Sequence, residues 1–222
     1  MSDITRFRNI HKGETCVIIG NGPSLNNTPL KQLSQKYMTF GSNKIYRLPF
    51  EPDYYSVIDK EMLETCTPFP PNFRPIMFLR AESRVTGNNP IYPIVAAGFS
   101  LDINNFVVMG GTVTFALLQI AFYMGFKTAL LVGVDHNYPG MKNVAPGSRF
   151  VAGEDDNNHF SPMDGRPYFE TGKTFNAPEL ENTEKSYSIA REVYEKTGRR
   201  IVNLTPGTKL NVFEKDSLQN WL

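Results

Sequence analysis

A long apolar stretch, running from Phe106 to Val134, limits the folds that this chain can adopt. Two glycine-containing interruptions, Gly110-Gly111 and Gly125-Phe126-Lys127, divide it into three pieces. The middle piece, Thr112 to Met124, would form about 20 Å of helix, whereas a membrane span needs about 30 Å. We therefore expect a buried helix with a buried strand on either side, and no transmembrane segment.

This pattern predicts a strand–helix–strand unit, with a strand over 106–109, a helix over 113–124 and a second strand over 129–134. Such units imply parallel strands with a right-handed crossover. Short runs of β-forming residues predict further strands over 15–20, 38–40, 53–58, 74–79 and 200–204. Residues 81–105 show no clear period, so we expect an irregular connection there.

Capping signals predict the helices that complete the fold. Thr28 is placed to cap a helix over 29–37, and Gly198 is placed to end a helix over 181–196. A short helix from Asp216 would close the chain. The expected fold class is α/β: a single Rossmann-like domain over residues 1–222, with a mostly parallel sheet and helices on both faces. The long polar segment at about 139–178 is expected to be a functional loop.

Composition excludes several classes of function. The formal net charge of +1 over 222 residues provides no basic field for nucleic acid or an anionic membrane. Two cysteines, Cys16 and Cys66, suggest neither a disulfide framework nor a zinc cluster. The segment from Met1 to Arg8 is polar and lacks an apolar core, which favours a cytoplasmic location. The apolar content permits a homo-oligomer.

Small and polar residues follow several of the predicted strands. Asn21 and Gly22 follow the first, Asn43 the second, Asp59 the third, and Asp135 the strand at 129–134. In an open parallel sheet the carboxyl ends of the strands form the ligand crevice, so these residues predict a nucleotide site. For any one of these loops alone, the alternative is that asparagine, glycine and serine simply make turns.

The Gly110-Gly111-Thr112 turn precedes the most apolar predicted helix. Two glycines at a helix N-terminus suit the close approach of a phosphate, and the Thr112 hydroxyl would add a donor. Close packing of the helix on a strand explains the glycines equally well. Neither this turn nor the one at 20–25 is a Walker A or complete G-x-G-x-x-G sequence, so no dinucleotide cofactor is indicated.

His159, within the polar segment 154–160, is the candidate general base. A histidine near a phosphate crevice can deprotonate a sugar hydroxyl at neutral pH. Two alternatives stay open at this stage: His159 as an exposed loop residue, and metal binding by Asp155, Asp156 and His159 together.

Three motifs resemble a known superfamily. The sequence Ile19-Gly-Asn-Gly-Pro-Ser-Leu25 resembles the nucleotide loop of bacterial sialyltransferases that modify lipooligosaccharide, and Ser42 to Tyr46 resembles their second strand end. The stretches from Gly110 and from Met124 to Tyr138 are similar to a signature of those sialyltransferases, of the motility accessory factors that glycosylate flagellin, and of archaeal 6-hydroxymethylpterin diphosphokinase-like proteins. The resemblance runs from about residue 14 to residue 214.

The resemblance implies a GT-A-type domain and a CMP-activated nonulosonic acid donor, with no metal required. It implies that Asn21, Gly22 and Ser24 hold the nucleotide and that Asn43 contacts the cytidine or ribose. It also implies that Gly111 and Thr112 match a loop near the donor, that Tyr138 lies near the donor phosphate, and that His159 is the base. Two positions depart from the family pattern. Asp59 stands where the sialyltransferases carry asparagine, and Val108 and Met109 stand where they carry an arginine.

The leading hypothesis is a glycosyltransferase that transfers a sugar, such as sialic acid, from a nucleotide-activated, CMP-linked donor to a hydroxyl of a glycan or other acceptor, with no cofactor. The second is a diphosphokinase that acts on a pterin-like alcohol and uses Mg²⁺ held by Asp59, Asp135 and Asp155. The third is a nucleotide-binding module without catalytic activity. Dependence on Mg²⁺ would separate the first two hypotheses.

Overall fold

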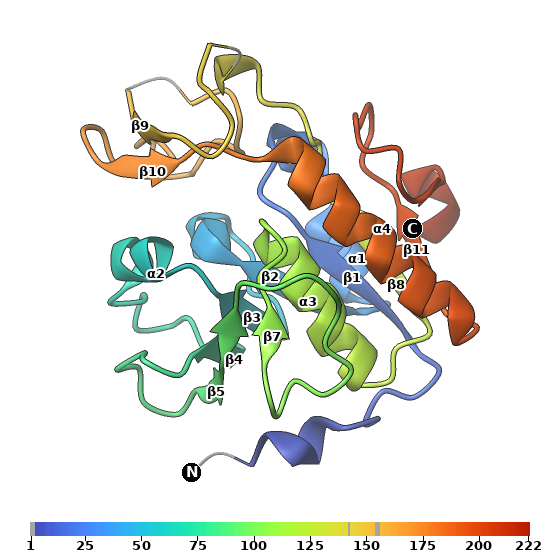
Figure 1. Ribbon diagram of the computed structural model, residues 1–222. Helices are drawn as coiled ribbons and strands as arrows, with labels where there is room; N and C mark the ends of the chain where they lie inside the picture. Colours follow the sequence, from blue (N-terminus) through green and yellow to red (C-terminus); the bar gives the residue numbers. More distant parts are fainter. Residues whose placement is uncertain (1–2, 142, 154–155) are drawn as a thin grey trace.

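An eight-stranded sheet forms the centre of the molecule (Figure 1). The computed structural model describes residues 3–141, 143–153 and 156–222. The order across the sheet is β12-β11-β8-β1-β2-β3-β4-β5, and each neighbouring pair runs parallel. The strands are β1 (Thr15–Ile19), β2 (Met38–Ser42), β3 (Tyr54–Val57), β4 (Ile76–Arg80), β5 (Asn89–Ile91), β8 (Thr128–Val132), β11 (Arg200–Asn203) and β12 (Glu214–Lys215).

Helices cover both faces of this sheet, as the sequence predicted. Side chains of successive strand residues point to opposite faces, so Cys16 and Ile18 join one core and Val17 and Ile19 the other. The first core packs against α3 (Val113–Tyr123) and α4 (Leu180–Lys196). The second packs against α1 (Leu30–Ser34) and α2 (Lys60–Cys66). The fold is therefore of the α/β class, with strands buried on both faces.

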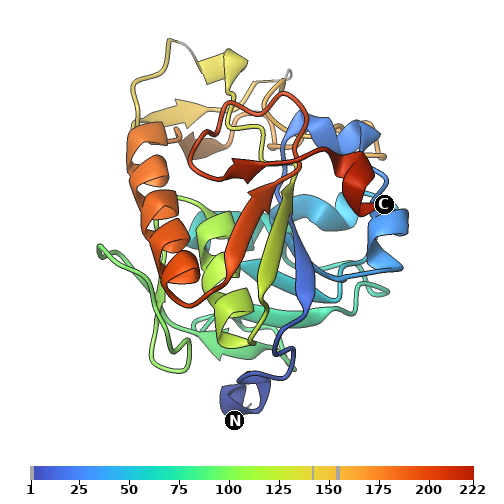
Figure 2. The same ribbon diagram turned by 90° about the vertical axis from the view of Figure 1, so that its right-hand side faces the viewer.

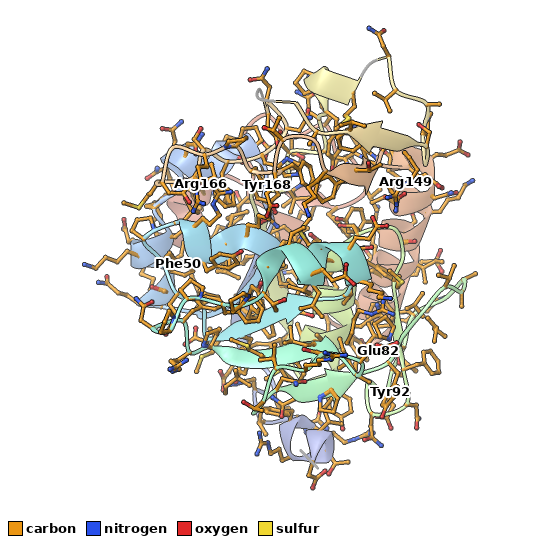
Figure 3. All side chains as sticks on the ribbon, turned by 90° about the vertical axis from the view of Figure 1, so that its left-hand side faces the viewer. Phe50, Glu82, Tyr92, Arg149, Arg166 and Tyr168 are labelled. Atoms are coloured by element: carbon orange, nitrogen blue, oxygen red, sulfur yellow. The ribbon has the colours of Figure 1, made fainter. Side chains whose placement is uncertain are left out.

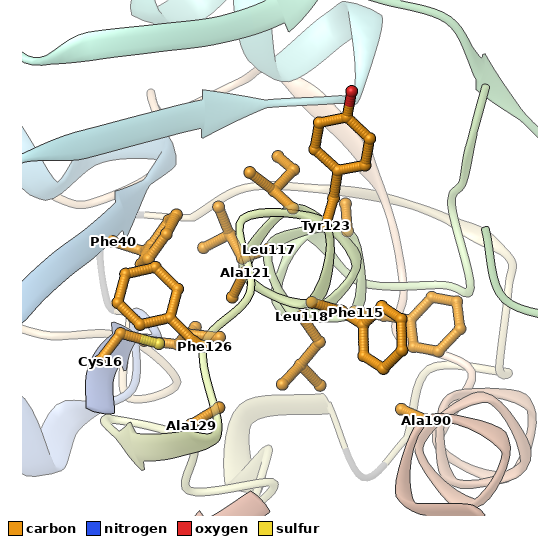
Figure 4. Close-up of a cluster of buried hydrophobic side chains, with 14 of the residues drawn as sticks. Cys16, Phe40, Phe115, Leu117, Leu118, Ala121, Tyr123, Phe126, Ala129 and Ala190 are labelled. Atoms are coloured by element: carbon orange, nitrogen blue, oxygen red, sulfur yellow. The ribbon is translucent and has the colours of Figure 1, made fainter. Parts of the chain in front are cut away.

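The helix α3 lies at the centre of the first core (Figure 4). Every residue from Thr114 to Tyr123 is buried, as is expected of a helix that is apolar on all sides. Phe115 packs edge-on against Phe99, and Phe126 packs edge-on against Phe40 on β2. Among the described residues, no helix combines the length and the hydrophobicity that a membrane crossing requires.

The predicted strand–helix–strand unit is wrong in one respect. The strand before α3, β7 (Val107–Val108), does not join the main sheet but pairs with β6 (Pro93–Ile94) in a separate two-stranded sheet. The strand after the helix, β8, has β1 on one side and β11 on the other. Because both edges of β8 are occupied, β7 has no place beside it.

Several boundaries also differ from the sequence prediction. The helix expected over 29–37 is the short α1, and the Thr28 hydroxyl bonds the carbonyl of Ser24 at 2.9 Å instead of capping that helix. Strands β5 and β6 lie within the region expected to be irregular. The helix expected from Asp216 is a 3₁₀ turn, η5 (Leu218–Trp221). Other 3₁₀ turns are η1 (Ile4–Phe7), η2 (Pro23–Asn27), η3 (Asn43–Arg47) and η4 (Pro139–Met141).

The segment at 139–178 contains an antiparallel hairpin, β9 (Arg149–Val151) and β10 (Thr174–Asn176). The hairpin stands beyond the end of the sheet at which β1 and β8 finish (Figures 1 and 2). It is tied to α2 by an ion pair of 2.6 Å between Arg149 and Glu61. The Phe160 amide donates to the Asn21 carbonyl at 2.9 Å, which ties the same segment to the loop after β1.

Candidate active site

The order of the strands across the sheet changes side at β1. Strands β2 to β5 follow one another on one side of β1, whereas β8, β11 and β12 lie on the other side. Ligands of open parallel sheets bind in the crevice outside the carboxyl ends of the strands at such a switch point. The loops that leave β1 and β8 meet here, because the Gly22 amide donates to the Gly133 carbonyl at 2.8 Å. A Cβ on Gly20 would lie 2.3 Å from that carbonyl oxygen, so the two loops approach too closely for a larger residue.

Asp135 fastens the loop after β1 to the loop after β8. Its carboxylate accepts hydrogen bonds from the Ser24 amide at 3.1 Å and from the Ser24 hydroxyl at 2.7 Å. The side chains of Ser24 and Asp135, both predicted to hold the donor, are thus engaged with each other. Each supports the shape of the loop from within the protein.

A cavity of about 880 Å³ opens at this end of the sheet. It is lined by all of the predicted site residues except Ser24: Asn21, Gly22, Asn43, Asp59, Gly110, Gly111, Thr112, Asp135, Tyr138 and His159. The remaining residue of the metal-binding alternative, Asp155, lies outside the described residues. Strand ends that are far apart in the sequence therefore surround one hollow, which is large enough for a nucleotide with an attached group.

Two asparagines line the cavity, Asn21 after β1 and Asn43 after β2. Asn21 donates from its Nδ2 to the Ser42 hydroxyl at 2.9 Å, while its Oδ1 is buried with no partner among the described residues. Asn43 follows with a φ of 51°, a left-handed conformation that asparagine tolerates better than most residues. A buried acceptor without a donor is costly, so the Asn21 amide is a place where a ligand donor would be favourable.

Asp59 has a structural role that the sequence analysis did not predict. Its carboxylate accepts from the Met62 amide at 2.7 Å and so caps α2, a helix that was not expected. Aspartate at this position also complements the positive end of the helix dipole.

The Gly110-Gly111-Thr112 turn leads into the N-terminus of α3. Both glycines have positive φ, and a Cβ on Gly110 would lie 2.2 Å from the Phe115 ring. Close packing therefore accounts for Gly110. The Thr112 hydroxyl accepts from the Thr114 amide at 3.4 Å and caps the helix. The turn and the first residues of the helix line the cavity, where backbone amides favour an anion.

His159 is paired with a carboxylate in the same segment. Its Nδ1 lies 2.8 Å from Asp156 Oδ2 and 3.0 Å from Asp156 Oδ1, and both side chains are largely buried. Burial raises the pKa of Asp156, but hydrogen bonds and the charge of His159 outweigh this effect and hold the pKa below its ordinary value. In a neutral imidazole, the hydrogen bond to Asp156 places the proton on Nδ1 and leaves Nε2 as the acceptor.

The His159 ring is also held by aromatic contacts. It stacks on Tyr168 with the ring centroids 4.1 Å apart and the planes within 6° of each other. Phe169 meets it edge-on at 4.9 Å. Figure 3 shows Tyr168 between Arg166 and Arg149, in the layer between the hairpin and α2.

A second histidine faces the cavity. His136 is buried, has a φ of 51°, and places its Nε2 3.0 Å from Glu184 Oε1 on α4. Tyr138, two residues further on, also lines the cavity, and burial followed by the charge of Asp135 raises its pKa. Left-handed backbone at a non-glycine residue tends to occur at functional sites.

The described lining is poor in positive charge. Its carboxylates are Asp59, Glu61, Asp135 and Glu179, whereas Lys185 is its one lysine and no arginine belongs to it. The described residues contain no group of three histidine, cysteine, aspartate or glutamate side chains that could hold a metal ion. Donor phosphates in this cavity would be held by backbone amides and hydroxyls, or would bring a cation with them.

A comparison with known protein families assigns the chain to one of them. The family model described as 6-hydroxymethylpterin diphosphokinase MptE-like matches residues 1–140, which carry β1 to β8 and the strand-end loops. The chain belongs to the MptE-like family. This confirms the predicted resemblance to 6-hydroxymethylpterin diphosphokinase-like proteins. His159 lies beyond the residues that the MptE-like model matches.

A search of curated proteins found no significant match. Among solved structures, the chain is similar to the sialyltransferase CstII from Campylobacter jejuni, which was solved in complex with a substrate analogue, cytidine-5'-monophosphate. The two chains are 12% identical, the match covers 92% of this chain and 85% of that chain, and the TM-score is 0.48.

Several residues of the site were not found from the sequence. Asp156 was considered only as a metal ligand, although it orients His159. Tyr168, which carries the stacked ring, and Glu184, which pairs with His136, were not considered. The spacing of three residues between Asp156 and His159 was the one local signal available.

Proposed function

We propose that this protein is a glycosyltransferase that moves a sugar from a nucleotide-activated donor to a hydroxyl group. The observation that carries the proposal is the Asp156–His159 pair at a cavity lined by the carboxyl ends of the parallel strands. A histidine oriented through Nδ1, with no hydrogen-bond partner at Nε2 among the described residues, is the arrangement that general-base catalysis requires. The motifs at residues 19–25 and 42–46, through their resemblance to sialyltransferases, support a CMP-linked sugar.

In the proposed reaction, Nε2 of His159 takes the proton of the acceptor hydroxyl. The acceptor oxygen then forms a bond to the anomeric carbon of the sugar as the bond from that carbon to the donor phosphate oxygen breaks. The nucleotide leaves as a phosphate anion, and the proton stays on the imidazole until solvent removes it. Asp156 stabilises the imidazolium formed in this step.

The negative charge of the leaving nucleotide would be met by the strand-end loops. The residues at the N-terminus of α3 and Tyr138 line the cavity, and their backbone amides and hydroxyl groups are among the donors available to it. The Asp59 carboxylate caps α2, and the Asp135 carboxylate accepts two hydrogen bonds from Ser24. This engagement favours a reaction without a metal ion over one in which the two carboxylates share Mg²⁺.

A second candidate is diphosphoryl transfer from ATP to a pterin-like alcohol with Mg²⁺. Membership of the MptE-like family favours it. The acidic lining also favours it, because a triphosphate would need a cation to enter beside Asp59 and Asp135. His159 would serve this reaction as well, since the alcohol must lose its proton.

Thermal-shift measurements with CMP, UDP, GDP and ATP, each with Mg²⁺ and with chelator, separate the two candidates. A ligand that binds the folded state at 100 times its Kd stabilises it by about 2.7 kcal/mol. Sugar transfer predicts a rise in Tm with CMP that survives chelation. A rise with ATP that requires Mg²⁺ would overturn the first candidate and support the second.

Replacement of the base tests the catalytic role directly. We expect His159→Gln to lower kcat by about 100-fold or more while the Kd of the nucleotide changes by less than about threefold. Asp156→Asn should lower kcat less, because Nε2 remains present but its tautomer is no longer fixed. A His159→Gln variant that turns over at the wild-type rate would exclude His159 as the base.

A further inference from the structure

The guanidinium of Arg47 is among the most fully bonded groups of the protein. It lies at the end of η3, a turn that begins at Asn43, and only 11% of its side chain is exposed. Its contacts are with Pro167 O at 2.8 Å, Arg166 O at 2.9 Å, Asp164 Oδ2 at 3.2 Å, Tyr168 O at 3.3 Å and Asp164 Oδ1.

The backbone of Arg47 holds the same segment. Its carbonyl accepts from the Met163 amide at 3.1 Å. Side chain and carbonyl together therefore fasten residues 163–168, most of which are exposed, to the end of η3. Three of the side-chain contacts are with the carbonyls of the consecutive residues 166–168. The planar guanidinium of arginine can donate to several acceptors placed in this way, whereas the single ammonium of a lysine cannot match them.

This fastened segment ends in Tyr168. Tyr168 is 1% exposed, and its ring is parallel to the His159 imidazole at 4.1 Å. The ammonium of Lys44, also in η3, lies 5.9 Å from the centroid of the Tyr168 ring. The turn η3 therefore holds Tyr168 both through its backbone, by way of Arg47, and through its ring.

Asp156 and Tyr168 restrain the imidazole in different ways. The bond to Asp156 fixes one nitrogen but leaves the ring plane free to turn about it. A face-to-face contact with a fixed ring removes that rotation and so directs Nε2. Displacement of a catalytic group by about 1 Å can cost about 100-fold in rate, so the support of the stacked ring matters.

We propose that Arg47 is a positioning residue for His159 and acts through Tyr168. The proposal rests on the proposed function, since it supposes that His159 is the base. It connects the strand end that carries Asn43 to the group that removes the proton. The plane of the imidazole is then set by β2 and η3 as well as by the segment that bears the histidine.

Nuclear magnetic resonance tests the positioning without a substrate. With histidine rings labelled by ¹³C, the three histidines give separable signals, and His159→Gln assigns the one of interest. Stacking on Tyr168 displaces the His159 ring protons upfield. We expect Arg47→Ala and Tyr168→Leu to abolish this displacement, and Tyr168→Phe to retain it. His11, which stacks on Phe126, serves as an internal reference.

The matched control is Arg166→Ala. Arg166 bonds the same Asp164 carboxylate at 3.0 Å, but its side chain is 79% exposed. We expect it to leave the His159 signals and kcat unchanged. Arg47→Lys keeps the charge but not the fork, so its ring-proton displacement should fall between those of the wild type and Arg47→Ala.

Kinetics provide the second readout. We expect Arg47→Ala to lower kcat by about 10- to 100-fold with the donor KM changed by less than about threefold. Tyr168→Leu should likewise lower kcat, whereas Tyr168→Phe should turn over at the wild-type rate. The double variant Arg47→Ala/Tyr168→Leu should be no worse than either single variant, because both act by the same route.

An Arg47→Ala protein that is folded and keeps the upfield His159 signals would overturn the proposal. So would a loss of donor binding equal to the loss of kcat, because that result marks a general collapse of the site. If the signals move as expected but His159→Gln retains activity, the positioning stands and the proposed function fails. Tyr168→Leu gives an independent measurement of the stack if Arg47→Ala does not fold.

Discussion

At the scale of single residues, the site depends on close approach between two loops. Gly22 stands where the chain leaves β1, and a Cβ there would lie 1.9 Å from Asp135 Oδ2. The same carboxylate receives both hydrogen bonds from Ser24. The glycine is therefore needed for the backbone to pass Asp135, independently of any nucleotide.

We expect Gly22→Ala to lower the free energy of unfolding by about 1–3 kcal/mol, because the new methyl group displaces the Asp135 carboxylate from Ser24. Urea denaturation measures the change. Gly153→Ala is the control, since a Cβ at Gly153 meets no atom of the described residues within 4 Å. Equal stability of the two variants would contradict this account of Gly22.

Asp164 predicts a dependence of stability on pH. The hydrogen bond from Arg47 is the largest cause that lowers its pKa, from 3.8 to about 2. The stabilisation is complete above the unfolded pKa and is lost as the pH falls through the folded pKa, because the unfolded chain binds the proton first. Wild type and Asp164→Asn should therefore differ in unfolding free energy at pH 6 and converge as the pH falls from about 4 to about 2.

Urea denaturation at several pH values measures this convergence. Because Asp164 is 35% exposed, solvent reduces the size of the effect but not its sign. In an Arg47→Ala background the change in stability caused by Asp164→Asn should be much smaller at every pH. A difference that grows on acidification would show that Arg47 does not hold this carboxylate.

At the scale of elements, one buried glutamine joins α3 to β7 and to Ser100. Gln119 is 0% exposed, and its Oε1 accepts from the amides of Ser100 and Val108 at 2.9 Å each. Its Nε2 donates to Val108 O at 2.8 Å and to Phe115 O at 3.1 Å. The side chain thus supplies β7 with the hydrogen bonds that a strand outside the main sheet would otherwise lack.

We expect Gln119→Leu to destabilise the protein by about 2–6 kcal/mol. It leaves the buried amides of Ser100 and Val108 without an acceptor, and each costs about 1–3 kcal/mol. Thermal or urea denaturation measures the loss. The exposed Gln35 is the matched control, and Gln35→Leu should change stability by less than about 0.5 kcal/mol. Comparable losses in the two variants would contradict the role given to Gln119.

At the scale of the whole molecule, the cavity lies between the main sheet and the segment that carries the hairpin. One wall is the carboxyl end of the parallel sheet, where β1 and β8 meet at the switch point. The other wall comes from described residues of the segment that carries the hairpin, among them Phe150, His159 and Phe169. The ion pair between Arg149 and Glu61 and the bond from Phe160 to Asn21 join the two walls.

The sequence alone was sufficient for the features that depend on neighbouring residues. The apolar runs at 15–20 and 129–134 predict buried parallel strands, because strands covered on both faces need no alternation, and these strands are β1 and β8. The breaks at Gly110-Gly111 and Gly125 locate α3. The rule that strand ends form the crevice places Asn21, Asn43 and Asp135 around one cavity.

Only the tertiary structure decided which polar side chains form hydrogen bonds within the protein and which face the cavity. Asp59 is a helix cap, Asp135 is a clasp for Ser24, and β7 lies outside the main sheet because β1 and β11 occupy both edges of β8. The orientation of His159 depends likewise on Tyr168 and on Arg47, which is 112 residues before it in the sequence. Local preferences are carried by adjacent residues, whereas partners depend on packing between segments that are distant in the chain.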